Sequence, residues 1–361
     1  MDLEQLFKID PYSMASSEKA SFLKDELTRL TGYHYENCKE YKNIIDAFPD
    51  EKKNFCEVTE VPYLPVRLFK LLDLHSVEKS NVIKTLTSSG TTSQVVSKIN
   101  IDKETSLLQT KALVNIVTSF IGGKRYPMIL VDAPNVIQDR TQFSARGAGL
   151  MGLINFGRNH FYLLDENMEI KLKELEDFLE KHKDQPILLF GFTFMVWQYL
   201  YLACKEKNIH LKLNNGILIH SGGWKKLQEI SVTNEVYKQK MNEQFGIDKA
   251  INFYGMVEQV GSIFMECEEG YLHAPNFADV IIRDPHTLEI LEQGLQGIVQ
   301  VISVLPKSYP GHSLLTEDLG TVYGEDNCKC GRKGKYFHIH GRLPSAELRG
   351  CSDTHAYNRG E

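Results

Sequence analysis

Residues 87–93, Thr-Ser-Ser-Gly-Thr-Thr-Ser, group six hydroxyl side chains around one glycine. Glycine allows the backbone to turn where a Cβ atom would clash. The hydroxyl groups and the backbone N–H groups of such a turn can surround an anion, for example a phosphate group. The segment lacks the Gly-Lys-Ser/Thr ending of a Walker loop, and an ordinary solvated loop is the alternative interpretation.

Three further groups of glycine and polar residues follow short apolar runs that have the length of a strand. They are Gly191–Thr193, Ser221–Trp224 and Tyr254–Glu258. In an open α/β sheet, ligands bind beyond the carboxyl ends of the parallel strands. These groups and the Ser88–Thr92 loop are therefore predicted to line one ligand site.

Alternating strand and helix patterns supply the elements that would position these groups. The predicted strands are 128–132, 187–190, 217–220 and 251–254, and the predicted helices are 103–120, 170–181, 193–208 and 225–245. This alternation predicts an α/β fold with a largely parallel sheet.

The two ends of the chain differ from this middle part. Residues 1–84 are predicted to be an N-terminal helical segment that packs on the core, and Phe22, Leu23, Leu27 and Leu30 have helical spacing. Residues 85–262 are the predicted α/β nucleotide-binding core. Residues 263–350 are predicted to be a β-rich subdomain, because the strand-like runs 278–283, 297–304 and 336–340 leave no room for long helices. Residues 351–361 form a short tail that carries Cys351.

Composition restricts the classes of function. The formal net charge of −6 argues against nucleic acid as a partner. No apolar run approaches the roughly 20 residues of a membrane span, and the first residues do not resemble a signal peptide. The seven cysteines are odd in number and scattered, which favours a reducing cytoplasm over a disulfide framework. The oligomeric state is not predicted.

Five motifs, in order, resemble those of the adenylate-forming enzymes, the acyl- and aryl-CoA ligase superfamily. The matching residues are Thr87, Ser88, Ser89, Gly90, Thr91 and Thr92 (phosphate loop), Ser221, Gly222 and Gly223 (adenine-side turn), Tyr254-Gly255-Met256-Val257-Glu258 (Tyr-Gly-x-x-Glu), Thr316-Glu317-Asp318 (Thr-x-Asp) and Gly341-Arg342. The resemblance implies the large N-terminal domain of these enzymes, a mainly parallel sheet flanked by helices, with a C-terminal β-rich subdomain.

The resemblance also implies a chemistry, in which a carboxylate oxygen attacks the α-phosphorus of ATP and pyrophosphate leaves. Both reactants are anionic, so positioning and charge stabilisation carry the catalysis. Glu258 would hold Mg²⁺, a cation that favours oxygen ligands. Tyr254 would offer adenine an aromatic face, and Asp318 would accept both ribose hydroxyls, with Arg342 adding positive charge. The alternatives are a solvated helix start for Glu258 and a turn before Gly320 for Asp318.

Cysteine and histidine spacing points to one branch of the superfamily. Cys267, His273, Cys328 and Cys330 resemble features of the phenylacetate-CoA ligase branch. Three cysteines and one histidine would also suit a tetrahedral structural zinc site. The alternative is a set of ordinary reduced thiols, with His273 on the surface.

The C-terminal sequence Leu-Arg-Gly-Cys-Ser, residues 348–352, resembles the ending of the acyl-protein synthetases (LuxE type) of bacterial fatty-acid reductase complexes. Ser221-Gly222-Gly223-Trp224-Lys225 resembles a further motif of that family. Only eleven residues follow Gly350, so the additional domain that bears a catalytic lysine in CoA ligases is expected to be absent. The resemblance implies that Cys351 accepts the acyl group from the adenylate as a thioester and passes it to a reductase partner.

Chemistry supports that role, since a thiolate is a strong nucleophile and Arg342 and Arg349 could lower the pKa of Cys351. The alternative is a disordered tail with an incidental cysteine. Two departures from the superfamily pattern are visible. The lysine after the phosphate loop is represented only by Lys98, and no hinge aspartate follows Gly341-Arg342.

The predicted function is therefore an ATP-dependent ligase that activates a carboxylic acid, with a fatty acid favoured, and carries the acyl group on Cys351. A phenylacetate-type CoA ligase with a missing or separate C-terminal domain is the first alternative, and a non-catalytic nucleotide-binding protein is the second. The acid itself cannot be named. Phe192, Trp197, Met256 and Val260 would suit an apolar acyl group, whereas Gln138, Arg140 and Gln142 would suit a polar one.

Overall fold

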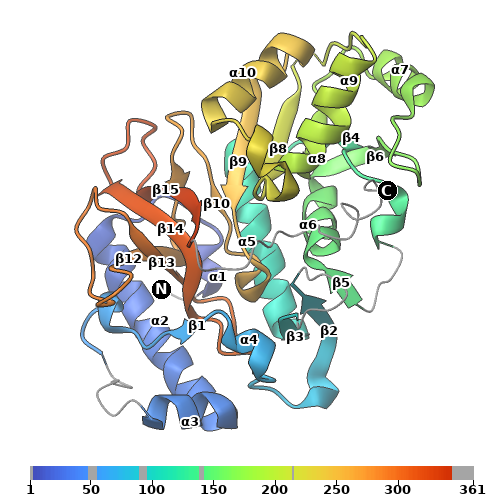
Figure 1. Ribbon diagram of the computed structural model, residues 1–361. Coiled ribbons are helices and arrows are strands. Elements are labelled where there is room, and N and C mark those ends of the chain that lie inside the picture. Colours follow the sequence, from blue (N-terminus) through green and yellow to red (C-terminus); the bar gives the residue numbers. More distant parts are fainter. Residues whose placement is uncertain (1–2, 48–54, 89–95, 138–141, 214, 344–361) are drawn as a thin grey trace. The chain divides into compact units, whose positions relative to one another are not determined.

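The computed structural model describes residues 3–47, 55–88, 96–137, 142–213 and 215–343 (Figure 1). These residues form two compact units. The first consists of the described parts of residues 1–120 and 254–348, and the second of the described parts of residues 121–253.

A parallel sheet forms the centre of the second unit. Its strands are β4 (Tyr126–Leu130), β6 (Gly157–Tyr162), β7 (Leu188–Phe192), β8 (Ile217–Ser221) and β9 (Lys249–Tyr254), in the spatial order β9-β8-β7-β4-β6. In the sheet Leu189 lies opposite both Ile129 and Leu218. Every residue of β7 is buried, as expected of a parallel strand that is covered on both faces. The four strands predicted in this region are confirmed.

Helices connect these strands. They are α6 (Ala145–Leu153), α7 (Leu172–Lys181), α8 (Thr193–Met195), the π-helix η5 (Val196–Leu202), α9 (Ala203–Glu206) and α10 (Asn234–Phe245), with short 3₁₀ turns η3 (Pro134–Ile137), η4 (Ile154–Phe156) and η6 (Lys225–Ile230) and a strand β5 (Gln142–Ser144). The predicted helix 193–208 is present, although a π-helical segment forms its middle.

The single long helix predicted for residues 225–245 is wrong. A 3₁₀ segment ends at Ile230, and α10 begins only at Asn234. Thr233 has an extended backbone, and its side-chain oxygen accepts a hydrogen bond from the N–H of Val236 at 3.4 Å, which is the geometry of an N-cap. Gly246 then ends α10 in the left-handed conformation.

The first unit contains a mostly antiparallel sheet. Its strands are β11 (Leu272–His273), β12 (Ala278–Arg283), β13 (Gly297–Ser303), β14 (Ser313–Glu325) and β15 (Lys335–Arg342), in the order β11-β15-β14-β13-β12, and β1 (Leu64–Pro65) pairs in parallel with β14. The sequence predicted β12, β13 and β15, but not β14, the longest strand among the described residues.

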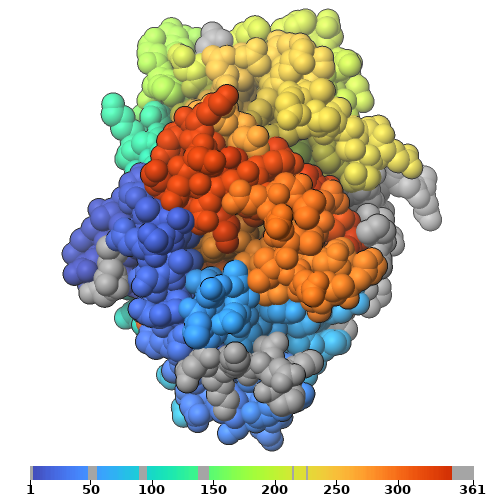
Figure 2. Space-filling view, turned by 90° about the vertical axis from the view of Figure 1, so that its left-hand side faces the viewer, coloured from blue at the N-terminus to red at the C-terminus, as the bar shows by residue number. Residues whose placement is uncertain are grey.

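Helices α1 (Leu3–Leu6), α2 (Ser16–Asn37) and α3 (Lys39–Ala47) begin the same unit. The predicted apolar face of α2 is confirmed, because Phe22, Leu23, Leu27 and Leu30 are all buried. The start of α2 is joined to the β-rich part of the unit: the N–H of Ser16 donates to Asp326 Oδ2 at 2.7 Å. In Figure 2 the N-terminal part of this unit, in blue, lies beside its β-rich part, in orange and red.

The first unit also contains shorter elements and the helix α5. They are η1 (Val58–Glu60), α4 (Leu68–Leu71), η2 (Lys79–Asn81), β2 (Val82–Thr87), β3 (Lys98–Asp102), α5 (Lys103–Ile121), η7 (Val257–Gln259) and β10 (Phe264–Met265). The predicted helix 103–120 is therefore confirmed. Over the described residues, every helix is too short or too polar to cross a lipid bilayer.

Candidate active site

Tyr254, Asp318 and Arg342 meet in the first unit, although they are far apart in the sequence. Tyr254 ends β9, Asp318 lies in the middle of β14, and Arg342 is its partner in the register of β14 and β15. The phenol of Tyr254 donates a hydrogen bond to Asp318 Oδ2 at 2.6 Å. Arg342 Nε lies 3.7 Å from Asp318 Oδ1. Asp318 is thus part of a strand, so the alternative that it is a turn residue is wrong.

Burial, Tyr254 and Arg342 together determine the ionisation of Asp318. Burial raises the pKa of Asp318, while the hydrogen bond from Tyr254 and the charge of Arg342 oppose that shift. Burial and the neighbouring carboxylate of Asp318 raise the pKa of Tyr254, which keeps the phenol protonated and able to donate. A carboxylate held in this way can still accept further hydrogen bonds, because each of its oxygens has two lone pairs.

Thr316 fixes the backbone next to Asp318. Its hydroxyl donates to the carbonyl of Val299 on the neighbouring strand at 2.7 Å and accepts the N–H of Asp318 at 3.1 Å. Glu317, which lies between these two residues, forms an ion pair with Arg67, and the Nη2–Oε1 distance is 2.7 Å. The Thr-x-Asp motif therefore places a threonine that fixes the strand and an aspartate that faces Tyr254 and Arg342.

Glu258 is buried in the turn η7, with only 7% of its surface exposed. The alternative that it is a solvated residue at a helix start is therefore wrong. Burial raises the pKa of Glu258, and the hydroxyl of Ser97 and the positive charges of Lys70 and Arg342 oppose this shift. A buried carboxylate with a raised pKa near positive charge is typical of functional sites.

The two ends of the Ser/Thr loop meet beside Glu258. The N–H of Ser88 donates to the carbonyl of Ser97 at 3.1 Å, and the N–H of Ser97 donates to the hydroxyl of Ser88 at 2.9 Å. Below them Thr87 pairs with Lys98 across β2 and β3, and the side chain of Lys98 is exposed. Ser89, Gly90, Thr91 and Thr92 lie outside the described residues. Ser97 was not predicted as a site residue, since a serine four positions after the loop carries no distinguishing pattern.

Ser221, Gly222 and Gly223 lie in the second unit, where β8 ends. Ser221 is buried and pairs in register with Phe253 of β9. Gly222 has a φ of +86°, a conformation that other residues rarely adopt. The predicted glycine turn at a strand end is therefore present. Gly255, which follows β9 in the chain, packs closely, because an added Cβ would lie 3.0 Å from Ile263.

Aromatic side chains gather near that turn in the second unit. Trp197 lies 5.1 Å from Trp224 and 5.7 Å from Tyr237, measured between ring centroids. His220 lies 4.5 Å from Tyr237 and its Nδ1 is 3.0 Å from the hydroxyl of Thr193. Burial lowers the pKa of His220 to about 3, so its ring is neutral. Phe192 and Trp197, predicted to line the acyl pocket, are both buried, and that role stays a prediction.

One buried ion pair at a strand end was not predicted. Asp132 follows β4, and Arg146 lies in α6. Both side chains are about 2% exposed, and Arg146 Nε donates to Asp132 Oδ2 at 2.7 Å. The signal available in the sequence was an aspartate directly after an apolar run, which marks the carboxyl end of a parallel strand.

Cys267, His273, Cys328 and Cys330 come together in the first unit. Their ligand atoms all lie within 4.8 Å of one another, and three of the four residues are buried. The alternative that His273 is a surface residue is wrong, since its exposed fraction is 0%. Cys351, the predicted nucleophile, lies outside the described residues.

Comparison with known proteins identifies the family. The family model described as "Acyl-protein synthetase, LuxE" matches residues 2–358. A long-chain-fatty-acid–luciferin-component ligase of Aliivibrio fischeri is 27% identical over 317 residues, which cover 85% of this chain and 81% of that protein. The ligase of the same name from Vibrio harveyi is 25% identical over 334 residues, covering 89% and 83%.

A solved structure supports the fold. The crystal structure of 2-hydroxyisobutyryl-CoA ligase in an open conformation, in complex with 2-HIB-AMP and CoA, aligns with a TM-score of 0.71 at 15% identity, over 95% of this chain and 80% of that one. This likeness confirms the predicted α/β fold of the adenylate-forming enzymes. Because the family model covers nearly the whole chain, the protein belongs to the acyl-protein synthetase (LuxE) family and is an ATP-dependent, AMP-forming ligase.

Proposed function

We propose that this ligase activates a long-chain fatty acid as an acyl-adenylate and transfers the acyl group to its own Cys351 as a thioester. The names of the Aliivibrio and Vibrio relatives support the choice of acid. The observation that carries the nucleotide part of the proposal is the hydrogen-bonded contact of Tyr254 with Asp318, with Arg342 beside it.

The donor set of this contact suits a nucleoside. Asp318 would accept the ribose hydroxyls, and the ring of Tyr254 would lie against the base. Arg342 would place its positive charge near the phosphates. Ser88, at the described end of the Ser/Thr loop, and Glu258 both contact Ser97, so the loop base and the buried carboxylate share one neighbourhood.

Glu258 fits a magnesium ligand, because it is a buried carboxylate and Mg²⁺ prefers a carboxylate together with substrate phosphates. When bound, Mg²⁺ would neutralise charge on the phosphates of ATP. Lys98 pairs with Thr87 at the base of the loop and would offer a second positive charge there.

The reaction has two steps. In the first, a carboxylate oxygen of the acid bonds to the α-phosphorus, and the bond from this phosphorus to the pyrophosphate oxygen breaks. In the second, the thiolate of Cys351 attacks the acyl carbon, and the carbon–oxygen bond to AMP breaks, so that AMP leaves with the electron pair. The proton of the thiol is released before the attack. The thioester then passes its acyl group to a protein acceptor, for which a reductase is the proposed partner.

Two assays test this proposal. Acid-dependent exchange of labelled pyrophosphate into ATP reports the first step across a panel of carboxylic acids. Acyl label that stays on the protein after denaturation reports the second. We expect Cys351→Ser to keep the exchange activity and lose the label, and Cys56→Ser, at an exposed cysteine, to keep both. Equal labelling of Cys351→Ser would remove that cysteine from the mechanism.

The CoA ligase alternative makes a different prediction. If CoA is the acceptor, adding CoA to the wild-type chain with ATP and acid should release acyl-CoA continuously, and Cys351→Ser should not change that rate. An acyl-protein synthetase should instead label itself once per chain until an acceptor protein is supplied. The cytoplasmic location that the sequence predicts stays a prediction.

A further inference from the structure

The four ligand atoms of Cys267, His273, Cys328 and Cys330 have the spacing of a tetrahedral metal site. Zn–S bonds of about 2.3 Å and Zn–N bonds of about 2.0–2.1 Å imply edges of about 3.8 Å between two sulfurs and about 3.6 Å between sulfur and nitrogen. The Sγ atoms of Cys267 and Cys328 are 4.0 Å apart. Cys330 Sγ is 3.4 Å from His273 Nε2. These two separations match a zinc site to within a few tenths of an ångström, and all four ligand atoms lie within 4.8 Å of one another.

Two copies of the same turn present the sulfur atoms. Cys267 stands three residues before Gly270, and Cys328 stands three residues before Gly331. In each turn the N–H of the glycine donates to the cysteine carbonyl at 3.0 Å. The two glycines have φ values of +84° and +83°, which other residues rarely adopt. Two segments about 60 residues apart thus converge with matching geometry.

From this geometry we propose that Cys267, His273, Cys328 and Cys330 bind one structural Zn²⁺ that joins two turns of the β-rich part of the first unit, on which the N-terminal segment of the chain packs. All four positions of a tetrahedral ion are filled by protein, which is typical of structural rather than catalytic zinc. A disulfide between Cys267 and Cys328 would need a sulfur separation near 2.0 Å and would leave Cys330 and His273 without a role.

The surroundings balance the charge of such a site. Zn²⁺ with three thiolates and a neutral histidine carries about one negative charge. Arg332 lies two residues after Cys330, close enough for their charges to interact, and pairs with Glu268 at 2.6 Å. Cys330, Arg332 and Glu268 line a surface hollow together with Tyr12, which gives a metal ion an entry path.

The N-terminal segment packs directly on these residues. The ring of Tyr12 lies edge-on to His273, with 6.0 Å between ring centroids, and its carbonyl accepts the N–H of Lys333 at 2.8 Å. The carbonyl of Pro11 accepts the N–H of Asn276 at 2.7 Å. Each of these partners is a metal ligand or lies within three residues of one.

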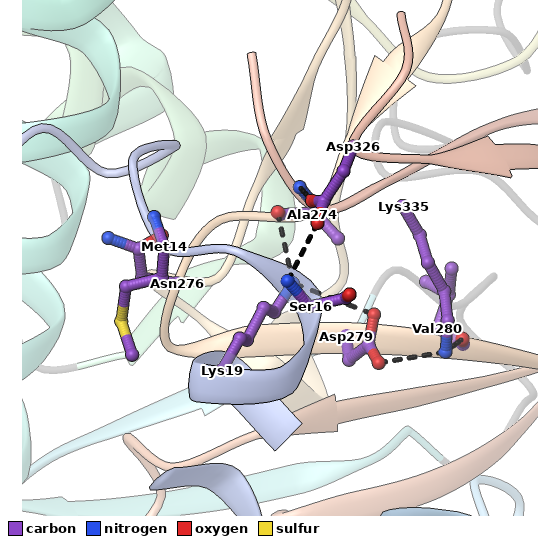
Figure 3. Close-up of polar contacts among 10 residues, drawn as sticks. Met14, Ser16, Lys19, Ala274, Asn276, Asp279, Val280, Asp326 and Lys335 are labelled. Carbon is purple, nitrogen blue, oxygen red and sulfur yellow. Dashed lines mark hydrogen bonds and ion pairs between the residues drawn. The ribbon is translucent and has the colours of Figure 1, made fainter. Parts of the chain in front are cut away.

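Figure 3 shows how the attachment continues along the chain. The N–H of Met14 donates to Asn276 Oδ1 at 3.1 Å, and Lys19 Nζ donates to the carbonyl of Ala274, the residue after His273, at 3.1 Å. Ser16 binds Asp326, two residues before Cys328. Loss of the metal should therefore loosen the two cysteine turns together with residues 10–19, which pack on them.

Metal analysis of the full-length protein tests the proposal, after purification without a metal-affinity tag. We expect about one zinc per chain in the wild type and in Cys56→Ser, the matched control at an exposed cysteine. Cys267→Ser and Cys330→Ser should retain less than about a fifth of that zinc. Cobalt-substituted wild-type protein should show the visible absorption of a tetrahedral thiolate site.

Hydrogen exchange then tests the role of the ion. In wild-type protein treated with a chelator, residues 10–19 should lose protection, and Tm should fall by more than about 5 °C; both should recover with added Zn²⁺. A reduced wild-type chain that contains no zinc and takes up neither zinc nor cobalt would overturn the proposal. Wild-type zinc content in both Cys267→Ser and Cys330→Ser would do so as well. Neither readout depends on ligase activity.

Discussion

Asp318→Asn is the sharpest test of the nucleotide site. The substitution keeps the size of the side chain and removes its charge, at a residue whose carboxylate accepts a 2.6 Å hydrogen bond from Tyr254. If Asp318 also accepts a ribose hydroxyl, the asparagine weakens that bond in the ATP complex. We expect the KM for ATP to rise while the fold is retained.

The expected size follows from the charge of the acceptor. Hydrogen bonds to charged groups contribute about 1.5–3 kcal/mol. Since about 1.4 kcal/mol corresponds to a factor of ten, losing one such bond should raise the KM for ATP roughly 10- to 140-fold. Arg342 Nε lies 3.7 Å from Asp318 Oδ1. The substitution would remove this ion pair as well, which adds to the effect.

Pyrophosphate exchange with modified nucleotides identifies the group that Asp318 contacts. In the wild type, 2′-deoxy-ATP and 3′-deoxy-ATP should each be poorer substrates than ATP. In Asp318→Asn the penalty for removing the contacted hydroxyl should nearly vanish, because two changes to one contact are not additive. Tyr254→Phe is the matched control: it removes the phenol that binds Asp318 but keeps the carboxylate and the aromatic face.

One result would refute this reasoning. If Asp318→Asn lowers activity by the same factor with ATP and with both deoxynucleotides, then Asp318 does not touch the ribose, and its bond to Tyr254 is structural only. Tyr254→Phe should in either case still discriminate against the deoxynucleotides, since the acceptor remains.

Three further predictions concern buried groups and a helix end. Glu258→Gln should abolish pyrophosphate exchange. The apoprotein should be about as stable as the wild type or more stable, by up to about 2 kcal/mol in urea unfolding, because an amide removes the cost of a buried charge. The activity of the wild type should fall as the pH drops through the raised pKa of Glu258. Asp279→Asn should cost about 3–5 kcal/mol of unfolding free energy, because the buried Lys19 and the half-buried Lys335 would lose their carboxylate partner, while exposed Glu292→Gln should cost almost nothing. Thr233→Ala should cost about 1 kcal/mol by removing the cap of α10, measured by the same denaturation.

The strand and helix rhythm of the second unit could be predicted because its strands are buried on both faces. Such strands appear in the sequence as continuous apolar runs, as in Ile217–His220. β14 could not be predicted in this way. It carries Thr316, Asp318 and two glycines, Gly320 and Gly324, and it pairs with β15 through two register shifts. Bulges and glycines interrupt the alternation on which a strand prediction depends.

The candidate site was predictable in its parts but not in its contacts. The motifs singled out Tyr254, Glu258 and Asp318, yet Tyr254 and Asp318 stand 64 residues apart and nothing in the sequence pairs them. Ser97 beside Glu258 carried no pattern at all. The aspartate after the apolar run 128–131 marked a strand end but did not reveal that Asp132 pairs with Arg146. Contacts of this kind are set by how the strands assemble, which the local sequence does not encode.

The buried carboxylates Asp279, Glu258 and Asp318 of the first unit differ in the direction of their pKa shift, and this direction distinguishes a structural carboxylate from one suited to bind a ligand. Burial alone would raise the pKa of Asp279, but Lys335 and Lys19 outweigh it and hold that pKa below the ordinary value. The stability that Asp279 contributes is therefore present at neutral pH and lost only as the pH falls through the lowered pKa. At Glu258 and Asp318 burial prevails and the pKa is raised, so their ionised forms weaken the apoprotein at neutral pH. A fold retains such a cost where a ligand compensates it, and a magnesium ion at Glu258 and ribose hydroxyls at Asp318 would supply that compensation.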